Sequence, residues 1–166
     1  MTTLILLRHA KSEYPLGVPD HDRPLSPRGR RDAPAAGRWL ASHAPTPQVV
    51  LVSSATRAQQ TWELASPEWP AAPDPVTEPR IYGASVPDLR AVVGALSPEA
   101  DVAVLVGHNP GLEQLAAELG RSGDAAAMTR MRAKYPTSGI AILQVPGGWR
   151  ELLVGAELSS FAVPRG

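Results

Sequence analysis

The sequence predicts an α/β fold, a three-layer α/β/α arrangement with a mostly parallel central sheet, and three observations support this prediction. Short and continuous apolar runs occur at 4–7, 49–52 and 102–106. Runs of this kind are typical of strands that are buried on both faces of a parallel sheet. Each run stops at a polar cluster, and segments with helical periodicity separate the runs. Strands that alternate with helices indicate an open sheet covered by helices on both faces.

The first helix has a clear start signal. Serine is a favoured N-cap and proline is favoured at the first helical position, so Ser26 and Pro27 predict that a helix begins there. Apolar residues continue at helical spacing to Ala41 with Pro34 among them, and we expect a late start or a kink at this proline. The other expected elements are helices over 55–64, 87–96 and 110–119, a strand over 139–145, a loop over 66–85 and an edge strand over 151–154.

Length and composition fit one domain spanning residues 1–166. The chain is 43% hydrophobic and 19% charged, which is the composition of a globular protein. Its formal net charge is zero, so no bulk field favours nucleic acid or a membrane as partner. It has no cysteine, which excludes disulfides and thiolate metal sites. The apolar run at 4–7 is too short for a signal peptide or a membrane span, so we expect a cytoplasmic protein.

The polar clusters after the predicted strands carry the candidate functional residues. Arg8 and His9 follow the first strand, Arg57 the second and His108 the third, with Ser12 nearby. The carboxyl ends of parallel strands meet at one edge, where ligands bind, so these residues are expected to share a crevice. Guanidinium groups bind tetrahedral oxyanions because they donate in pairs and stay protonated, which predicts a phosphate or sulfate site. Ser12 either donates to this anion or caps a turn.

A histidine in such a crevice is a competent nucleophile when a hydrogen bond holds its second nitrogen. The run 6–12, Leu-Leu-Arg-His-Ala-Lys-Ser, resembles the Arg-His-Gly signature of the histidine phosphatase superfamily, also called the phosphoglycerate mutase-like fold. The segments 53–61 and 106–109 resemble its second arginine and second histidine motifs, and 22–29 resembles its entry into the first helix. The Arg-His-Ala-Lys-Ser run and the short chain look most like the SixA-type phosphohistidine phosphatases.

The resemblance implies that His9 accepts the phosphoryl group, that Arg8 and Arg57 clamp its oxygens, and that His108 contacts them from the opposite side. Water then hydrolyses phospho-His9, and no metal or organic cofactor is implied. The favoured function is a metal-independent protein phosphohistidine phosphatase. The alternatives are a small-molecule phosphomonoesterase of the same superfamily and a non-catalytic phosphate-binding module. The expected partner is a phosphorylated protein or a small phosphorylated metabolite.

The chain departs from the family pattern in two places. Ala10 stands where the family usually has glycine, and Asn109 stands where one branch has the aspartate that protonates the leaving group. Glu78 is the nearest candidate for that acid, followed by Asp20 and Asp22. The P–N bond of phosphohistidine is labile and its imidazole leaves easily, so a missing acid favours this substrate.

Overall fold

A seven-stranded sheet forms the centre of the protein. The computed structural model describes the backbone of residues 1–166 and all side chains except those of residues 153 and 154. The strand order is β3-β2-β4-β1-β6-β7-β5, and all neighbours are parallel except that β6 runs antiparallel to β1 and β7. The strands are β1 (Thr2–Arg8), β2 (Val49–Val52), β3 (Val76–Thr77), β4 (Val102–Gly107), β5 (Gly120–Gly123), β6 (Ile140–Val145) and β7 (Ala156–Ala162). The prediction of a mostly parallel sheet is confirmed.

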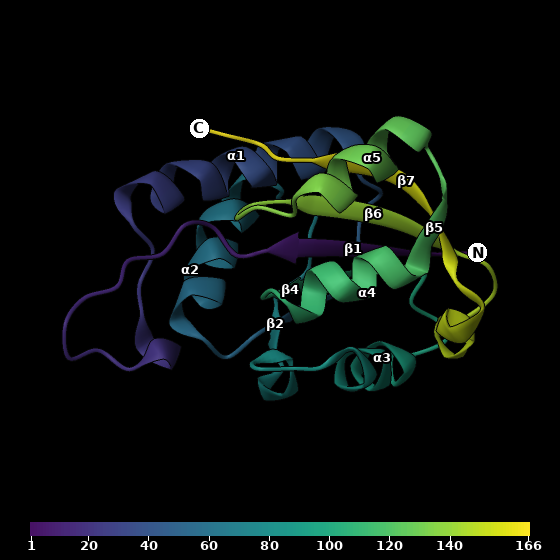
Figure 1. Cartoon of the computed structure of the whole chain (residues 1–166), viewed down its shortest axis with the longest axis horizontal. Helices are drawn as coiled ribbons and strands as arrows, with labels where there is room; N and C mark the ends of the chain where they lie inside the picture. Colours follow the sequence, from purple (N-terminus) through teal and green to yellow (C-terminus); the bar gives the residue numbers. More distant parts are fainter.

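Helices cover both faces of this sheet (Figure 1). The α-helices are α1 (Pro27–His43), α2 (Thr56–Ala65), α3 (Val86–Gly94), α4 (Gly111–Leu119) and α5 (Ala125–Ala133). The 3-10 helices are η1 (Asp20–Asp22), η2 (Ser66–Glu68), η3 (Pro79–Ile81) and η4 (Trp149–Val154). Among the described residues, none of the helices combines the length and apolar character that a bilayer span requires.

Strand β1 shows how the three layers are built. Its apolar residues alternate between the two faces of the sheet, because successive side chains of a strand point in opposite directions. Ile5 and Leu7 pack in the core cluster that includes α1 and α2, whereas Leu4 and Leu6 pack in the cluster that includes α3, α4 and α5. All four are fully buried, so the continuous apolar run serves both cores. The three-layer prediction is confirmed.

The start of α1 lies against the segment that follows β1. The Ser26 hydroxyl accepts a hydrogen bond from the Gly29 N–H at 3.1 Å, as the N-cap signal predicted. The helix then continues without a break through Pro34, so the expected late start is wrong. Gly29 is needed at the contact, because a Cβ there would collide with the Lys11 carbonyl group. The helix start therefore supports the backbone just after the Arg8-His9 pair.

Two expectations from the sequence are corrected by tertiary contacts. The stretch at 66–85, predicted to be a loop, contains the short elements η2, β3 and η3. Strand β3 forms because it pairs in parallel with β2. The predicted edge strand at 151–154 is wrong, since this stretch belongs to η4. The Trp149 indole donates to the Ala100 carbonyl at 2.8 Å, and Arg90 Nη1 donates to the Leu152 carbonyl at 3.0 Å. These bonds hold the stretch against α3 rather than in the sheet.

Three elements near the C-terminus were not predicted. Helix α5 has a local signal, because the Asp124 carboxylate caps it by accepting from the Ala127 N–H at 2.7 Å, ahead of an alanine run. Strand β7 has alternating burial, but its pairing with β6 shifts register between Ile142 and Leu143. Strand β5 reads Gly-Arg-Ser-Gly and carries no strand signal, so only its pairing with β7 makes it a strand.

Candidate active site

A cavity of about 440 Å³ lies at the carboxyl end of β1, where residues 9–26 extend beyond the sheet (Figure 1). The structure brings together there all the residues that were expected at strand ends, together with Ser12. The lining residues are Arg8, His9, Lys11, Ser12, Tyr14, Asp20, Arg23, Arg57, Tyr82, Gly83, His108, Asn109 and Thr137. They come from segments far apart in the chain, as expected for parallel strands that end at one edge.

The His9 ring is held in one tautomer. Its Nδ1 lies 2.7 Å from the Ala10 carbonyl oxygen, which only accepts, so Nδ1 carries the proton and donates it there. The lone pair is therefore on Nε2, which accepts from Arg57 Nε at 3.4 Å. Burial lowers the pKa of His9 well below its usual 6.5, and His108, Arg57 and Arg8 lower it further. His9 is thus a neutral imidazole at pH 7 with its lone pair toward Arg57.

Hydrogen bonds tie the turn after His9 to helix α2. The Ala10 N–H donates to Thr61 Oγ1 at 3.0 Å, and that hydroxyl donates to the Arg57 carbonyl at 2.6 Å. The Ala10 methyl group is fully buried beside Leu25 and Ala33. Alanine therefore fits where the family usually has glycine, and the backbone just after His9 is linked to the Arg57 backbone through one hydroxyl.

The two arginines are each held by a backbone carbonyl group. Arg8 Nη1 donates to the Tyr135 carbonyl at 3.0 Å, and Arg57 Nη1 donates to the Asp20 carbonyl at 2.7 Å. Arg8 Nε is buried and has no partner among the described residues, so it is an unused donor. Burial lowers the pKa of Arg8, but a guanidinium group stays charged at any physiological pH. Together with Lys11 and Arg23, the pair makes the cavity lining rich in positive charge.

His108 faces His9, and its ring has a hydrogen-bond partner in Ser53. The two ring centroids are 5.1 Å apart, and His108 Nε2 lies 2.7 Å from Ser53 Oγ. That hydroxyl also accepts from the Ala55 N–H at 3.3 Å, and we assign its own proton to the hydrogen bond with His108 Nε2. The ring proton is then on Nδ1, which is buried without a partner among the described residues. Burial, with a contribution from Arg57, lowers the pKa of His108 to about 4, so this ring is neutral too.

The cavity also contains a carboxylate, Asp20. Its Oδ2 accepts from the Tyr82 hydroxyl at 2.6 Å and from Arg57 Nη2 at 3.2 Å, and its Oδ1 accepts from Arg23 Nε at 3.0 Å. These donors, led by Tyr82, hold the pKa of Asp20 well below its usual range. Asp20 was one of the acid candidates, and in this arrangement it is ionised at neutral pH and accepts hydrogen bonds.

Arg23 and Tyr82 are site residues that the sequence reasoning missed. Arg23 is buried, and its Nη1 donates to Ser12 Oγ at 2.7 Å, which leaves the Ser12 proton available to another acceptor. The Tyr82 ring packs edge-on against His21 and His108. The motif at 22–29 was the only signal for Arg23. Nothing around Tyr82 marked it, because it lies in the stretch that was predicted to be a loop.

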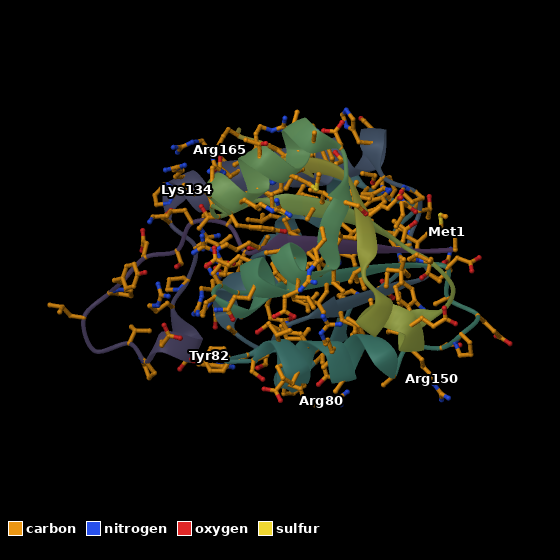
Figure 2. The ribbon with its side chains drawn as sticks, turned by 45° about the vertical axis from the view of Figure 1, so that its right-hand side comes forward. Met1, Arg80, Tyr82, Lys134, Arg150 and Arg165 are labelled. Carbon is orange, nitrogen blue, oxygen red and sulfur yellow. The ribbon has the colours of Figure 1, made fainter. Side chains whose placement is uncertain are left out.

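The structure does not bring Glu78 to the cavity. Its carboxylate accepts from Arg80 Nε at 2.9 Å and from Nη2 at 3.0 Å, and these bonds lower its pKa. Figure 2 shows Arg80 at the outer edge of the protein, whereas Tyr82 lies toward the long loop. Asp22 also lies outside the cavity lining, where its carboxylate contacts His21 Nδ1 at 3.2 Å.

A buried neutral histidine beside two guanidinium groups, at the carboxyl edge of a mostly parallel sheet, defines a class of phosphoryl-binding α/β enzymes. The model of the histidine phosphatase superfamily (branch 1) matches residues 4–82. Together with the relatives described next, this match shows that the chain belongs to the histidine phosphatase superfamily, in its SixA-type branch, and that it is a phosphatase with the phosphoglycerate mutase-like fold.

The relatives extend the similarity along the whole chain. An uncharacterized protein of Mycobacterium tuberculosis (strain H37Rv) is 43% identical over 162 residues, covering 96% of this chain and 100% of that protein. A putative phosphohistidine phosphatase SixA from Nakamurella multipartitia is 32% identical with a TM-score of 0.86, covering 98% of this chain and 96% of that one. The corresponding structure from Agrobacterium tumefaciens is 29% identical with a TM-score of 0.80, covering 98% of both chains.

Proposed function

We propose that this protein is a metal-independent protein phosphohistidine phosphatase that works through a covalent phosphohistidine at His9. One observation carries the proposal: the Nδ1 proton of His9 is bound by the Ala10 carbonyl, so Nε2 is unprotonated and its lone pair faces Arg57. An imidazole needs this arrangement, a fixed tautomer with the reactive nitrogen unprotonated, in order to act as a nucleophile.

The reaction has two displacements at phosphorus. In the first, the Nε2 lone pair of His9 attacks the phosphorus atom, the P–N bond of the substrate breaks, and the substrate imidazole leaves with the bonding pair and takes a proton from solvent. In the second, a water oxygen attacks phospho-His9 and the electron pair of its P–N bond returns to Nε2. The released protons go to the phosphate and to solvent. His9 returns to its neutral, unphosphorylated form.

The surrounding donors stabilise the charge on the transferred group. We assign Arg8 and Arg57 to the phosphoryl oxygens, and Nδ1–H of His108, which has no partner among the described residues, as a further donor. Fixed donors stabilise the spread charge of a phosphoryl transition state without having to reorganise. The neutral state of both histidines is consistent with this division of work, since the arginines supply the charge and the rings supply a nucleophile and a donor.

The choice of phosphohistidine rests on the state of the carboxyl groups. An alkyl phosphate needs a proton donor for its leaving oxygen, and a carboxyl group serves only when it is protonated near the operating pH. Glu78 is bound by Arg80 outside the cavity, and Asp20 is ionised by its three donors. The imidazole of phosphohistidine leaves without such help. The 32% identity to a putative phosphohistidine phosphatase supports the same choice.

The experiment compares wild type and His9→Ala on a histidine-phosphorylated protein and on 4-nitrophenyl phosphate. We expect wild type to hydrolyse the phosphorylated protein with the higher kcat/KM. We expect His9→Ala to lose roughly 10³-fold or more on both substrates. An alkaline quench with ³²P-labelled substrate is expected to trap label on wild type and none on the variant.

The other outcomes distinguish the alternatives. Hydrolysis of 4-nitrophenyl phosphate alone indicates a small-molecule phosphomonoesterase. Phosphate binding without turnover of either substrate indicates a non-catalytic module. Equal rates for wild type and His9→Ala show that His9 is not the nucleophile.

A further inference from the structure

Exposed apolar side chains gather in one short segment beside the cavity. Among the described residues, five large hydrophobic side chains are exposed, and three of them lie within residues 14–18. Tyr14 is 75% exposed, Leu16 fully exposed and Val18 37% exposed. Scattered exposed hydrophobics are ordinary on a protein surface, but a contiguous group beside a functional site marks an interaction surface. We call residues 14–18 the apolar tip.

The apolar tip has a defined turn structure. The Val18 N–H donates to the Pro15 carbonyl at 3.4 Å, and Gly17 has φ +75° at the third position of this four-residue turn. Glycine at that position with positive φ is typical of a type II β-turn. The turn places Leu16 at its apex. A surface that is already ordered loses little conformational entropy when a partner binds.

The apolar tip is continuous with the cavity and anchored to it. Tyr14 lines the cavity, and the Arg23 guanidinium lies 4.0 Å from the centroid of its ring. Arg23 also donates to the Ser12 hydroxyl at 2.7 Å and to the Glu13 carbonyl at 3.1 Å. The base of the segment is therefore fixed to the site, while its apex extends from the molecule in the long loop seen in Figures 1 and 2.

We propose that the apolar tip is the docking surface for the protein that carries the substrate phosphohistidine. The inference rests on the proposed function and deepens it. His9 is only 6% exposed, so a phosphorylated histidine must enter the cavity to reach it. A histidine side chain is short, so the surface of the protein that bears it is brought against the rim. The matching partner presents apolar side chains next to its phosphohistidine, which pack on Leu16 and Val18.

Two other occupants fit the observations less well. Tyr14 belongs both to the apolar tip and to the cavity lining, so a second copy of this chain bound to the tip would cover the cavity mouth and block substrate entry. A membrane surface could pack on Leu16 and Val18, but it places no group in the cavity, so it does not account for the continuity of the tip with the cavity through Tyr14. A phosphorylated protein satisfies both constraints, since its phosphohistidine occupies the cavity while its apolar surface covers the tip.

The test compares Leu16→Asp with wild type on three substrates that share the same chemistry at His9. They are a histidine-containing phosphotransfer domain phosphorylated with phosphoramidate, free phosphohistidine and 4-nitrophenyl phosphate. We expect kcat/KM for the phosphorylated domain to fall roughly tenfold, the usual loss when a central apolar contact is removed. We expect the values for the two small substrates to stay unchanged, because Leu16 does not line the cavity.

Val76→Asp is the matched control. Val76 is 54% exposed on β3 and lies outside the cavity lining, so we expect this variant to behave as wild type on all three substrates. The docking proposal is overturned when Leu16→Asp leaves the phosphorylated domain unaffected, or when it lowers all three activities equally. It is also overturned when the only effect of Leu16→Asp is the loss of a dimer, or the loss of binding to lipid vesicles, with hydrolysis of the phosphorylated domain unchanged. Wild type that fails on the phosphorylated domain overturns the proposed function itself, and the docking with it.

Discussion

Arg57 is held by Asp20 through two contacts. Its Nη1 donates to the Asp20 backbone carbonyl at 2.7 Å, and its Nη2 donates to the carboxylate Oδ2 at 3.2 Å. The same carboxylate also accepts from Tyr82 and Arg23. A carboxylate thus engages donors that a phosphoryl group also attracts. We therefore expect the substrate to compete with Asp20 for Arg57.

Asp20→Asn is expected to tighten the binding of inorganic phosphate. The amide keeps the shape of the side chain but removes a negative charge next to Arg57, so a phosphate dianion meets less repulsion and less competition. We expect the inhibition constant of phosphate against 4-nitrophenyl phosphate hydrolysis to fall several-fold. The matched control is Asp22→Asn, which changes the same charge outside the cavity lining. Weaker phosphate binding in Asp20→Asn would show that Asp20 mainly orients Arg57.

Ser53→Ala is expected to release the tautomer of His108. The hydroxyl that lies 2.7 Å from Nε2 is lost, so the proton of the ring is no longer confined to Nδ1. ¹⁵N NMR of the histidine rings should show Nδ1–H for His108 in wild type and a mixture in the variant. We expect kcat to fall about tenfold, the equivalent of one buried hydrogen bond.

Ser54→Ala is the control for this prediction. The Ser54 hydroxyl lies 3.0 Å from His21 Nε2 and does not contact His108, so we expect wild-type kcat and an unchanged His108 spectrum. A wild-type spectrum with the proton on Nε2 contradicts the assignment of roles to Ser53 and His108.

Acid is expected to destabilise the fold through the buried histidines. The pKa of His108 is about 4 in the folded protein against 6.5 for a free side chain, and that of His9 is lowered in the same direction. Between these two pH values the unfolded chain binds a proton that the folded chain does not. The free energy of unfolding therefore falls as the pH drops from 6.5 toward 4, by up to about 3 kcal/mol for His108.

Urea unfolding of wild type and His108→Asn near pH 7 and near pH 5 checks this expectation. The variant should lose less stability on acidification than wild type does. Replacement of His43 by glutamine is the control, because His43 is exposed at the end of α1 and should leave the difference between the two pH values intact. An equal loss in His108→Asn and wild type contradicts the prediction.

Much of the fold could be predicted because its signals are local. A strand buried on both faces must be apolar throughout, so β1, β2 and β4 were visible as continuous runs. Strands β5 and β7 were not visible, since one is glycine-rich and the other has a shifted register. The stretch at 151–154 looked like a strand, but bonds from distant residues hold it in a 3-10 helix.

The residues of the candidate site also fall into a group that local signals predict and a group that they do not. The meeting of Arg8, His9, Arg57 and His108 could be predicted from the sequence, because each lies at the end of a parallel strand and such strands end at one edge. The residues around these four depend on tertiary contacts. Asp20, Arg23 and Tyr82 enter the cavity from irregular segments, and Glu78 is kept outside it by Arg80. The conformation of an irregular segment depends on hydrogen bonds to residues far away in the chain, and no local pattern encodes those partners.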